Sequence, residues 1–259
     1  MNSWKVALID QTTGAVVPVA SLEQYMAALQ QQVDDDLLPT WGVRADISVL
    51  GAGDQIPRGT WPIKIVDSLD NAGGVHLDDQ GQPYAEAVNG EQLSIAISHE
   101  LLEMLVDPWG NRFSEAADLD PNSDGHQVFY LVEVCDPCEA ANYVIDGVPV
   151  SDFVLPSFYV PNATDSVDFL NALAGPLPRT VPQGCYISWM DPQDMKWHQQ
   201  QLNGTFVTGD ANTGVNPRAD RDSALGDEDA NRHDIPAIYR SWPKAVKRLP
   251  RPGKHPIPG

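Results

Sequence analysis

The chain has 259 residues, enough for one large domain or two small ones, and its hydrophobic fraction of 42% is ordinary for a globular protein. Residues 240–259 carry six Lys and Arg and no Asp or Glu, which leaves ten basic residues against 36 acidic ones in residues 1–239. Such an acidic body repels nucleic acids and membrane surfaces and attracts cations. Because there is no long apolar run and no secretory signal pattern at the N-terminus, we expect a cytoplasmic protein, with incorporation into a virion as the alternative.

The pattern of the first half of the chain predicts several strands and two helices. A helix starting near Ser21 is indicated by Gln24, which completes a capping box, and by apolar residues at four-residue spacing. We expect it to end near Gly42, and we expect Gly73-Gly74 to form a flexible break. The predicted strands are residues 4–9, 45–50, 63–66 and 84–88, and they precede a long apolar helix at about 91–106.

After that helix the sequence becomes richer in turn residues. Residues 114–126 are acidic. The apolar residues 128–134 predict a buried strand or an apolar helix turn. Residues 143–150 predict a hairpin around Asp146-Gly147. Prolines then interrupt an irregular region, and residues 203–234 are polar enough to predict a linker or loop. We therefore place one domain at residues 1–200 and a polar linker with a basic, Pro-rich tail at 201–259.

The helix near residue 100 concentrates its ionisable side chains on one side. With His99 at zero, Glu103, Asp107 and Glu100 fall at about 40°, 80° and 100° around an ideal helix. The remaining surface is apolar almost all round, which indicates a buried helix. Buried carboxylates cost several kcal/mol each unless they are neutralised, and a divalent cation would neutralise them. His99 and Glu103, one turn apart, present a nitrogen and an oxygen donor to the same point, which suits zinc.

This pattern resembles the helix of the zincin metallopeptidases, which carries H-E-x-x-H, except that Glu103 stands in place of the second histidine. The resemblance implies that His99 and Glu103 are metal ligands and that Glu100 is the general base for a metal-bound water. It also implies a mixed sheet before the helix, whose edge strand pairs with substrate, and residues 84–88 are our candidate for that strand. A carboxylate ligand in the second position reduces the positive charge of the site, so zinc would lower the pKa of its bound water less.

Three segments together resemble a family of uncharacterised bacterial and phage proteins, over roughly residues 20–160. They are Ser98–Pro108, with the pattern S-H-E-x-x-E-M-L-x-D-P, and the segments Glu133–Pro137 and Val150–Pro156. This resemblance implies a single fold and a shared site and does not identify a reaction.

Zincins of the gluzincin type take a third ligand, a glutamate, from a segment downstream of the helix. Glu133, which lies in an apolar run, is the candidate that this resemblance implies, with Asp136 close behind. The alternative for Glu133 is a pairing with Arg112 or with a backbone amide. His76 could approach the cleft from the strand side, although a lone histidine is more often a core or surface residue.

A second possible cation site lies between residues 118 and 125. Its oxygen donors alternate as in the first half of a calcium loop, but Leu131 stands where such a loop has its closing glutamate. An acidic surface turn is the alternative. The candidate calcium ligands are Asp118, Asp120, Asn122 and Asp124.

The three cysteines are too few, and odd in number, for a disulfide framework. Cys135 and Cys138 have the C-x-x-C spacing of half a zinc ribbon or of a redox pair, but the sequence has no second pair. We expect all three thiols, including that of Cys185, to be buried and unreactive.

These observations predict an α+β fold with a zincin-like mixed sheet, a buried active-site helix and an irregular C-terminal part. The expected function is a zinc-dependent hydrolase of peptide or amide bonds. The alternative is a non-catalytic structural or assembly protein, such as a phage virion component, that keeps a metal for stability. A peptide or protein substrate is the expected partner, and the basic tail could contact an acidic partner or other subunits of an assembly.

Overall fold

The computed structural model describes residues 3–69, 72–163, 166–173 and 179–209. It contains helices and mixed sheets, so the α+β class is confirmed. None of the described helices is long and apolar enough to cross a membrane. The basic tail, and the polar segment from residue 210, lie outside the described residues.

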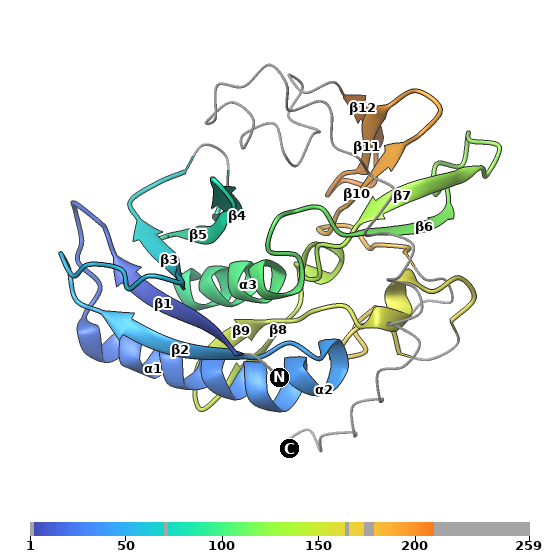
Figure 1. Cartoon of the computed structure of the whole chain (residues 1–259). Coiled ribbons are helices and arrows are strands. Elements are labelled where there is room, and N and C mark those ends of the chain that lie inside the picture. The colour runs from blue at the N-terminus through green and yellow to red at the C-terminus, as the bar shows by residue number, and fades with distance from the viewer. Residues whose placement is uncertain (1–2, 70–71, 164–165, 174–178, 210–259) are drawn as a thin grey trace.

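Sheet A is built from the first half of the chain and has five strands in the order β2-β1-β3-β5-β4 (Figure 1). The first four are mutually parallel, and β4 runs antiparallel to β5 at the edge. The strands are β1 (Trp4–Asp10), β2 (Ala45–Leu50), β3 (Thr60–Val66), β4 (Gly74–Asp79) and β5 (Gln82–Val88).

One long helical segment follows β1. It comprises α1 (Val19–Gln31), the π-helical turn η1 (Gln32–Leu37) and α2 (Leu38–Trp41). It begins two residues before the predicted start, after Pro18, and no side chain caps it, so the expected capping box does not form. It ends as predicted at Gly42, whose φ of 71° is a conformation that glycine adopts without strain.

The central helix α3 (Leu93–Val106) packs against β4 and β5 of sheet A and against the hairpin strand β9. That hairpin joins β8 (Asn142–Ile145) to β9 (Val148–Ser151) and also contacts α1, so α3 is covered on several sides. The predicted helix and hairpin are therefore present, with boundaries that shift by one or two residues.

Sheet B is a separate antiparallel sheet formed by the second half of the chain, in the order β12-β11-β10-β7-β6. Its strands are β6 (Phe113–Ala117), β7 (Gln127–Leu131), β10 (Ile187–Asp191), β11 (Lys196–Gln200) and β12 (Phe206–Gly209), while η2 (Asp136–Cys138) and η3 (Pro156–Tyr159) are short 3-10 turns. One hydrophobic cluster runs from sheet A through α3 into sheet B.

Two expectations about the sheets differ from the structure. The predicted edge strand, residues 84–88, is β5 and lies between β3 and β4, so β4 forms this edge of the sheet. β4 begins at Gly74, within the expected flexible break at Gly73-Gly74. The region expected to be irregular contains β10, β11 and β12, and β12 pairs with β11 beyond the domain end expected at residue 200. Prolines and polar residues in the turns between these short strands obscured their alternation.

Candidate metal centre

A buried polar network fixes the position of α3. The Ser98 hydroxyl donates to Gln32 Oε1 at 2.8 Å and accepts the backbone N–H of Ser151 at 3.0 Å. Gln32 in turn donates to the Ser151 carbonyl at 2.9 Å. Because every group in this triangle is buried and paired, the helix is held in one register between η1 and β9. The side chain that follows Ser98 is that of His99.

His99, Glu103 and Asp136 meet where α3 passes the η2 turn. His99 Nε2 lies 3.1 Å from Asp136 Oδ1 and 3.5 Å from Glu103 Oε1. One potential ligand atom from each of the three residues lies within 4.8 Å of the others. Their side chains are 13%, 4% and 3% exposed, so an ion among them would be shielded from bulk water. The predicted pair on the helix thus gains a third donor from the C-terminal half of the chain.

His76 brings a second imidazole to the same helix from β4. Its Nδ1 atom lies 3.4 Å from Glu103 Oε2 and 3.6 Å from Glu100 Oε2. The two oxygens of Glu103 therefore face different histidines, with Oε1 toward His99 and Oε2 toward His76. Sequence reasoning named His76 without assigning it to the site, because only the pairing of β4 with β5 brings this strand beside α3.

Glycine at position 74 leaves room for the Glu100 side chain where β4 approaches the helix. A Cβ atom on Gly74 would lie 2.6 Å from Glu100 Oε1 and 2.7 Å from its Cγ, closer than such atoms ever pack. Gly74 therefore lets the edge strand lie directly against the Glu100 side chain. A Cβ atom on the neighbouring Gly73 would meet nothing within 4 Å.

Carboxylates outnumber histidines in this cluster, with Glu100, Glu103, Glu133 and Asp136 around His76 and His99. Burial and the nearby carboxylates raise the pKa values of Glu100, Asp136 and Glu133, although the neighbouring histidines oppose the rise at the first two. Burial also raises the pKa of Glu103, but His99 and His76 outweigh it and leave this pKa lowered. An excess of buried acid is the environment that a divalent cation relieves.

The same surroundings raise the pKa values of the two histidines. Burial would lower the pKa of His76, but the hydrogen bonds and charges of Glu100 and Glu103 raise it to about 10. Burial likewise opposes the rise at His99, where the carboxylates prevail and the pKa lies well above its usual value. A cation at His99 would replace the proton that these carboxylates otherwise hold there.

Two other predicted residues lie at the margin of the site. Glu133 approaches Asp136 and influences its ionisation, but it does not belong to the group of converging ligand atoms, in which Asp136 takes the third place. Asp107 follows the end of α3 and accepts the backbone N–H groups of Asn111 and Arg112 at 2.9 and 2.8 Å. Its carboxylate therefore holds the loop after α3.

The predicted calcium loop forms a series of local turns. Asp118 accepts the backbone N–H of Asp120, Asp120 accepts that of Asn122, and Asp124 accepts that of His126. Among the described His, Cys, Asp and Glu residues, Asp118 groups with His126 and not with Asp120 or Asp124.

The three cysteines are free and buried, as expected. Cys135 and Cys138 direct their thiols to the carbonyl oxygens of different residues, His99 and Val134. Burial raises the pKa of each of the three thiols, which disfavours the reactive thiolate.

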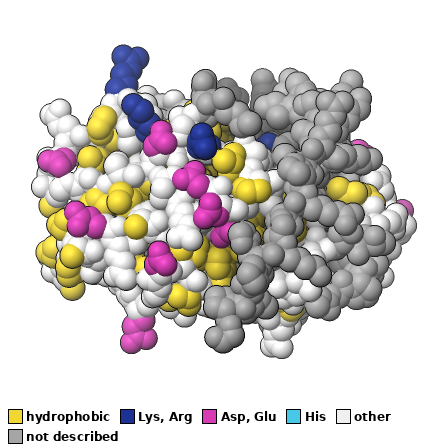
Figure 2. Space-filling model, turned by 90° about the horizontal axis from the view of Figure 1, so that it is seen from below, with side chains coloured by type: hydrophobic (Ala, Val, Ile, Leu, Met, Phe, Trp, Pro, Cys, Tyr) yellow, Lys and Arg dark blue, Asp and Glu magenta, His cyan; other side chains and the backbone are white. Residues whose placement is uncertain are grey.

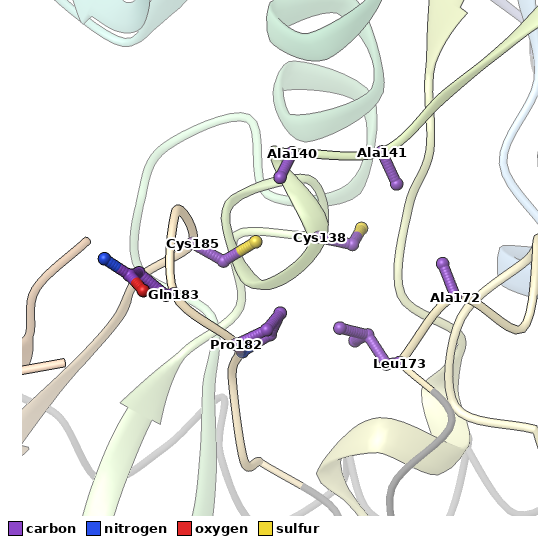
Figure 3. A pocket seen from close by; sticks show the side chains of 8 residues that line it. All are labelled: Cys138, Ala140, Ala141, Ala172, Leu173, Pro182, Gln183 and Cys185. Carbon is purple, nitrogen blue, oxygen red and sulfur yellow. The ribbon is translucent and has the colours of Figure 1, made fainter. Parts of the chain in front are cut away.

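A cavity of about 270 Å³ lies beside the η2 turn, and Cys138 and Cys185 contribute to its wall (Figure 3). Small apolar side chains form most of the lining, and Gln183 is the polar member. None of the described residues that line it is a histidine or a carboxylate, so the cavity is distinct from the ligand cluster formed by His99 and its neighbours.

The surface on the α1 side shows a different distribution of charge. Figure 2 shows acidic side chains scattered between apolar ones on this face, with a few basic side chains and no histidine among the residues drawn in colour. The acidic residues therefore do not gather into one patch on this face.

Compared with protein-family models, with curated proteins and with solved structures, the chain gives no match.

Proposed function

We propose that the chain is a metal-dependent hydrolase of peptide or amide bonds with a zincin-like site. One observation carries the proposal: donor atoms of His99, Glu103 and Asp136 converge within 4.8 Å in a buried cluster with an excess of carboxylates. One nitrogen and two oxygens suit zinc and other first-row divalent ions. Bound there, such an ion would supply Lewis acidity toward a carbonyl group and toward water.

Glu100 is the residue assigned to proton transfer. It follows His99 directly on α3, lies beside the ligand group, and contacts His76 and Gly74 of the edge strand β4. Burial raises its pKa, which brings a carboxylate nearer to the range in which it works as a general base. In this proposal Glu100 accepts a proton from the attacking water and delivers it to the leaving amine, and His76 holds the carboxylate in place.

The position of the edge strand β4 beside α3 supports a peptide substrate. This strand forms one of the two edges of sheet A within the described residues, and it passes directly beside Glu100. An extended peptide could add to such an edge through backbone hydrogen bonds, which would place a peptide bond near α3. Peptide and protein substrates are therefore favoured over small esters.

A second candidate function is a structural metal site in an assembly protein, and the enclosure of the cluster favours it. The side chains of Glu100, Glu103 and Asp136 are 7%, 4% and 3% exposed. Structural metal sites are closed, whereas catalytic ones keep a position open to substrate.

The two functions are separated by Glu100→Gln, tested on metal-loaded protein with a library of fluorogenic peptides and with metal analysis of the same samples. A hydrolase keeps its metal content and loses at least about 100-fold in turnover, the range expected for loss of a general base. Glu91→Gln removes an exposed carboxylate two residues before α3 and serves as the control, with unchanged turnover. A wild-type protein that cleaves no peptide, but whose melting temperature falls on chelation, would support the structural function instead.

A further inference from the structure

Sheet B carries a second group of His and Asp side chains, away from α3. Asp118 follows β6, His126 precedes β7 and Asp191 ends β10. One potential ligand atom from each lies within 4.8 Å of the other two. Sequence reasoning included Asp118 in a calcium loop but gave no reason to combine it with Asp191, since only the pairing of β7 with β10 brings these segments together.

The imidazole of His126 is arranged as a metal ligand would be. Its Nδ1 atom lies 2.8 Å from Asp124 Oδ1, and a carboxylate on one ring nitrogen is the usual way to orient a histidine whose other nitrogen binds a metal. The other nitrogen, Nε2, is shielded from solvent and faces the carboxylate of Asp191. Asp191 and Asp124 together raise the pKa of this imidazole, so in the absence of a metal a proton takes the place between them.

The spacing around Nε2 fits two neighbouring ligands of one ion. His126 Nε2 lies 2.9 Å from Asp191 Oδ1. Two ligands bound at right angles with bonds of about 2.1 Å would be about 3.0 Å apart. The separation of the nitrogen and the oxygen is therefore compatible with two ligands of one cation, as it is with a direct ion pair.

The two carboxylates are already held in position. Asp118 Oδ1 accepts the backbone N–H of Asp120 at 3.0 Å, and Asp191 Oδ1 accepts that of Gln193 at 2.7 Å. Asp191 is only 6% exposed. Ligands that are fixed before binding lose little conformational entropy when an ion arrives.

The site lies where the two hairpins of sheet B meet. Strands β7 and β10 are joined by only two registered residue pairs, whereas the β6–β7 and β10–β11 hairpins have five each. Asp118 and His126 come from the first hairpin and Asp191 from the second. A cation bound by all three would therefore connect the hairpins at the junction where the sheet has the fewest backbone pairs.

We propose that Asp118, His126 and Asp191 bind a first-row divalent cation that clamps the two hairpins of sheet B together, with Asp124 positioning His126. The set of one imidazole and two carboxylates suits zinc or manganese better than calcium, which prefers oxygen ligands alone. This site is independent of the proposed hydrolase centre, so either could exist without the other.

The test is a count of zinc equivalents bound by the full-length chain after chelation, by isothermal titration and by metal analysis after gel filtration. Wild type is expected to bind one equivalent that both His126→Gln and Asp191→Asn lose and that His99→Gln keeps. Asp120→Asn is the matched control, because it removes the same charge from the same loop while keeping an oxygen for the N–H of Asn122. A calcium loop would instead lose calcium binding in this control.

Two further readouts follow the addition of zinc to the folded chain. The ¹⁵N resonance of His126 Nε2 in the wild-type chain should shift when zinc is added, and zinc should raise the melting temperature of wild type more than that of Asp191→Asn. The proposal is overturned if both variants keep the full wild-type stoichiometry, or if zinc leaves the His126 resonance unchanged. If one variant does not fold, the other and the resonance decide.

Discussion

Glu103 and Cys135 are joined across the candidate metal centre: Glu103 Oε1 accepts the backbone N–H of Cys135 at 3.0 Å. The same oxygen lies 3.3 Å from the backbone nitrogen of Asp136, which also donates to it. One carboxylate on α3 thus fixes the turn that carries the third candidate ligand. Glu103 consequently stabilises the η2 turn in addition to any role in binding a cation.

Glu103→Ala should therefore destabilise the fold even when no metal is present. The change leaves the amide groups of Cys135 and Asp136 buried without an acceptor, which costs about 2–4 kcal/mol in total. Glu103→Gln keeps an oxygen for these amides and should retain more of the stability. Urea unfolding in the presence of a chelator measures both, and equal stabilities for the two variants would contradict the anchoring role.

The third ligand can be identified by comparing two neighbouring carboxylates. Asp136→Asn should weaken zinc binding by at least about 100-fold, because its oxygen lies 3.1 Å from His99 Nε2 within the converging group. Glu133→Gln should change zinc affinity less, since Glu133 acts on Asp136 from outside that group. Competition titration with a chromogenic chelator gives both affinities. The reverse order would make Glu133 the ligand.

The contact between β4 and α3 predicts a contrast between adjacent glycines. Gly74→Ala should displace the Glu100 side chain, because the new Cβ atom would lie within 2.6 Å of its carboxylate oxygen. Peptide hydrolysis should fall by about ten-fold or more, the scale expected when a catalytic group is misplaced, while zinc content is kept. Gly73→Ala, whose Cβ atom would meet nothing within 4 Å, should leave hydrolysis unchanged. Similar rates for the two variants would show that Glu100 does not need this position.

A buried pair of aspartates should make stability depend on pH. Asp152 is fully buried, and burial together with Asp168 raises its pKa to about 8. Because this value lies above the value of 3.8 for the unfolded chain, the fold favours the protonated form. The stabilisation is complete below the unfolded pKa and is lost as the pH rises through the folded one, by at most about 1.4 kcal/mol per unit.

Asp152→Asn should flatten this dependence, because an amide does not ionise and still offers an oxygen to the N–H groups of Phe153 and Leu170. Urea unfolding of both proteins between pH 5 and pH 8 measures the effect, with the wild type losing more stability over this interval. Parallel curves would mean that Asp152 is already ionised in the folded protein at pH 5.

Much of sheet A and the helix α3 could be predicted from the sequence, because their apolar periodicity is strong. β2 was predicted with its observed bounds, Ala45–Leu50, and the hairpin around Asp146-Gly147 was located by its turn. β4 was missed because Gly74, which the packing against Glu100 requires, is also the residue that signals a break. A local pattern could not distinguish these two uses of glycine.

The candidate site was predicted only as far as one helix could show it. His99, Glu100 and Glu103 share a side of α3, and this follows from helical geometry alone. The roles of His76 and Asp136 depend on strand pairing and on the η2 turn, which set their distance from α3. Helical geometry also included Asp107, but that residue follows the end of the helix and binds its own loop.

The central claim is that a cation lies among His99, Glu103 and Asp136, and anomalous X-ray diffraction tests it most directly. Crystals of the full chain, grown with zinc and without chelator, would be measured on both sides of the zinc absorption edge. The account predicts an anomalous peak about 2.0–2.2 Å from His99 Nε2 and from one oxygen each of Glu103 and Asp136. Zinc-edge maps without a peak there, with His99 hydrogen-bonded directly to Asp136, would contradict it.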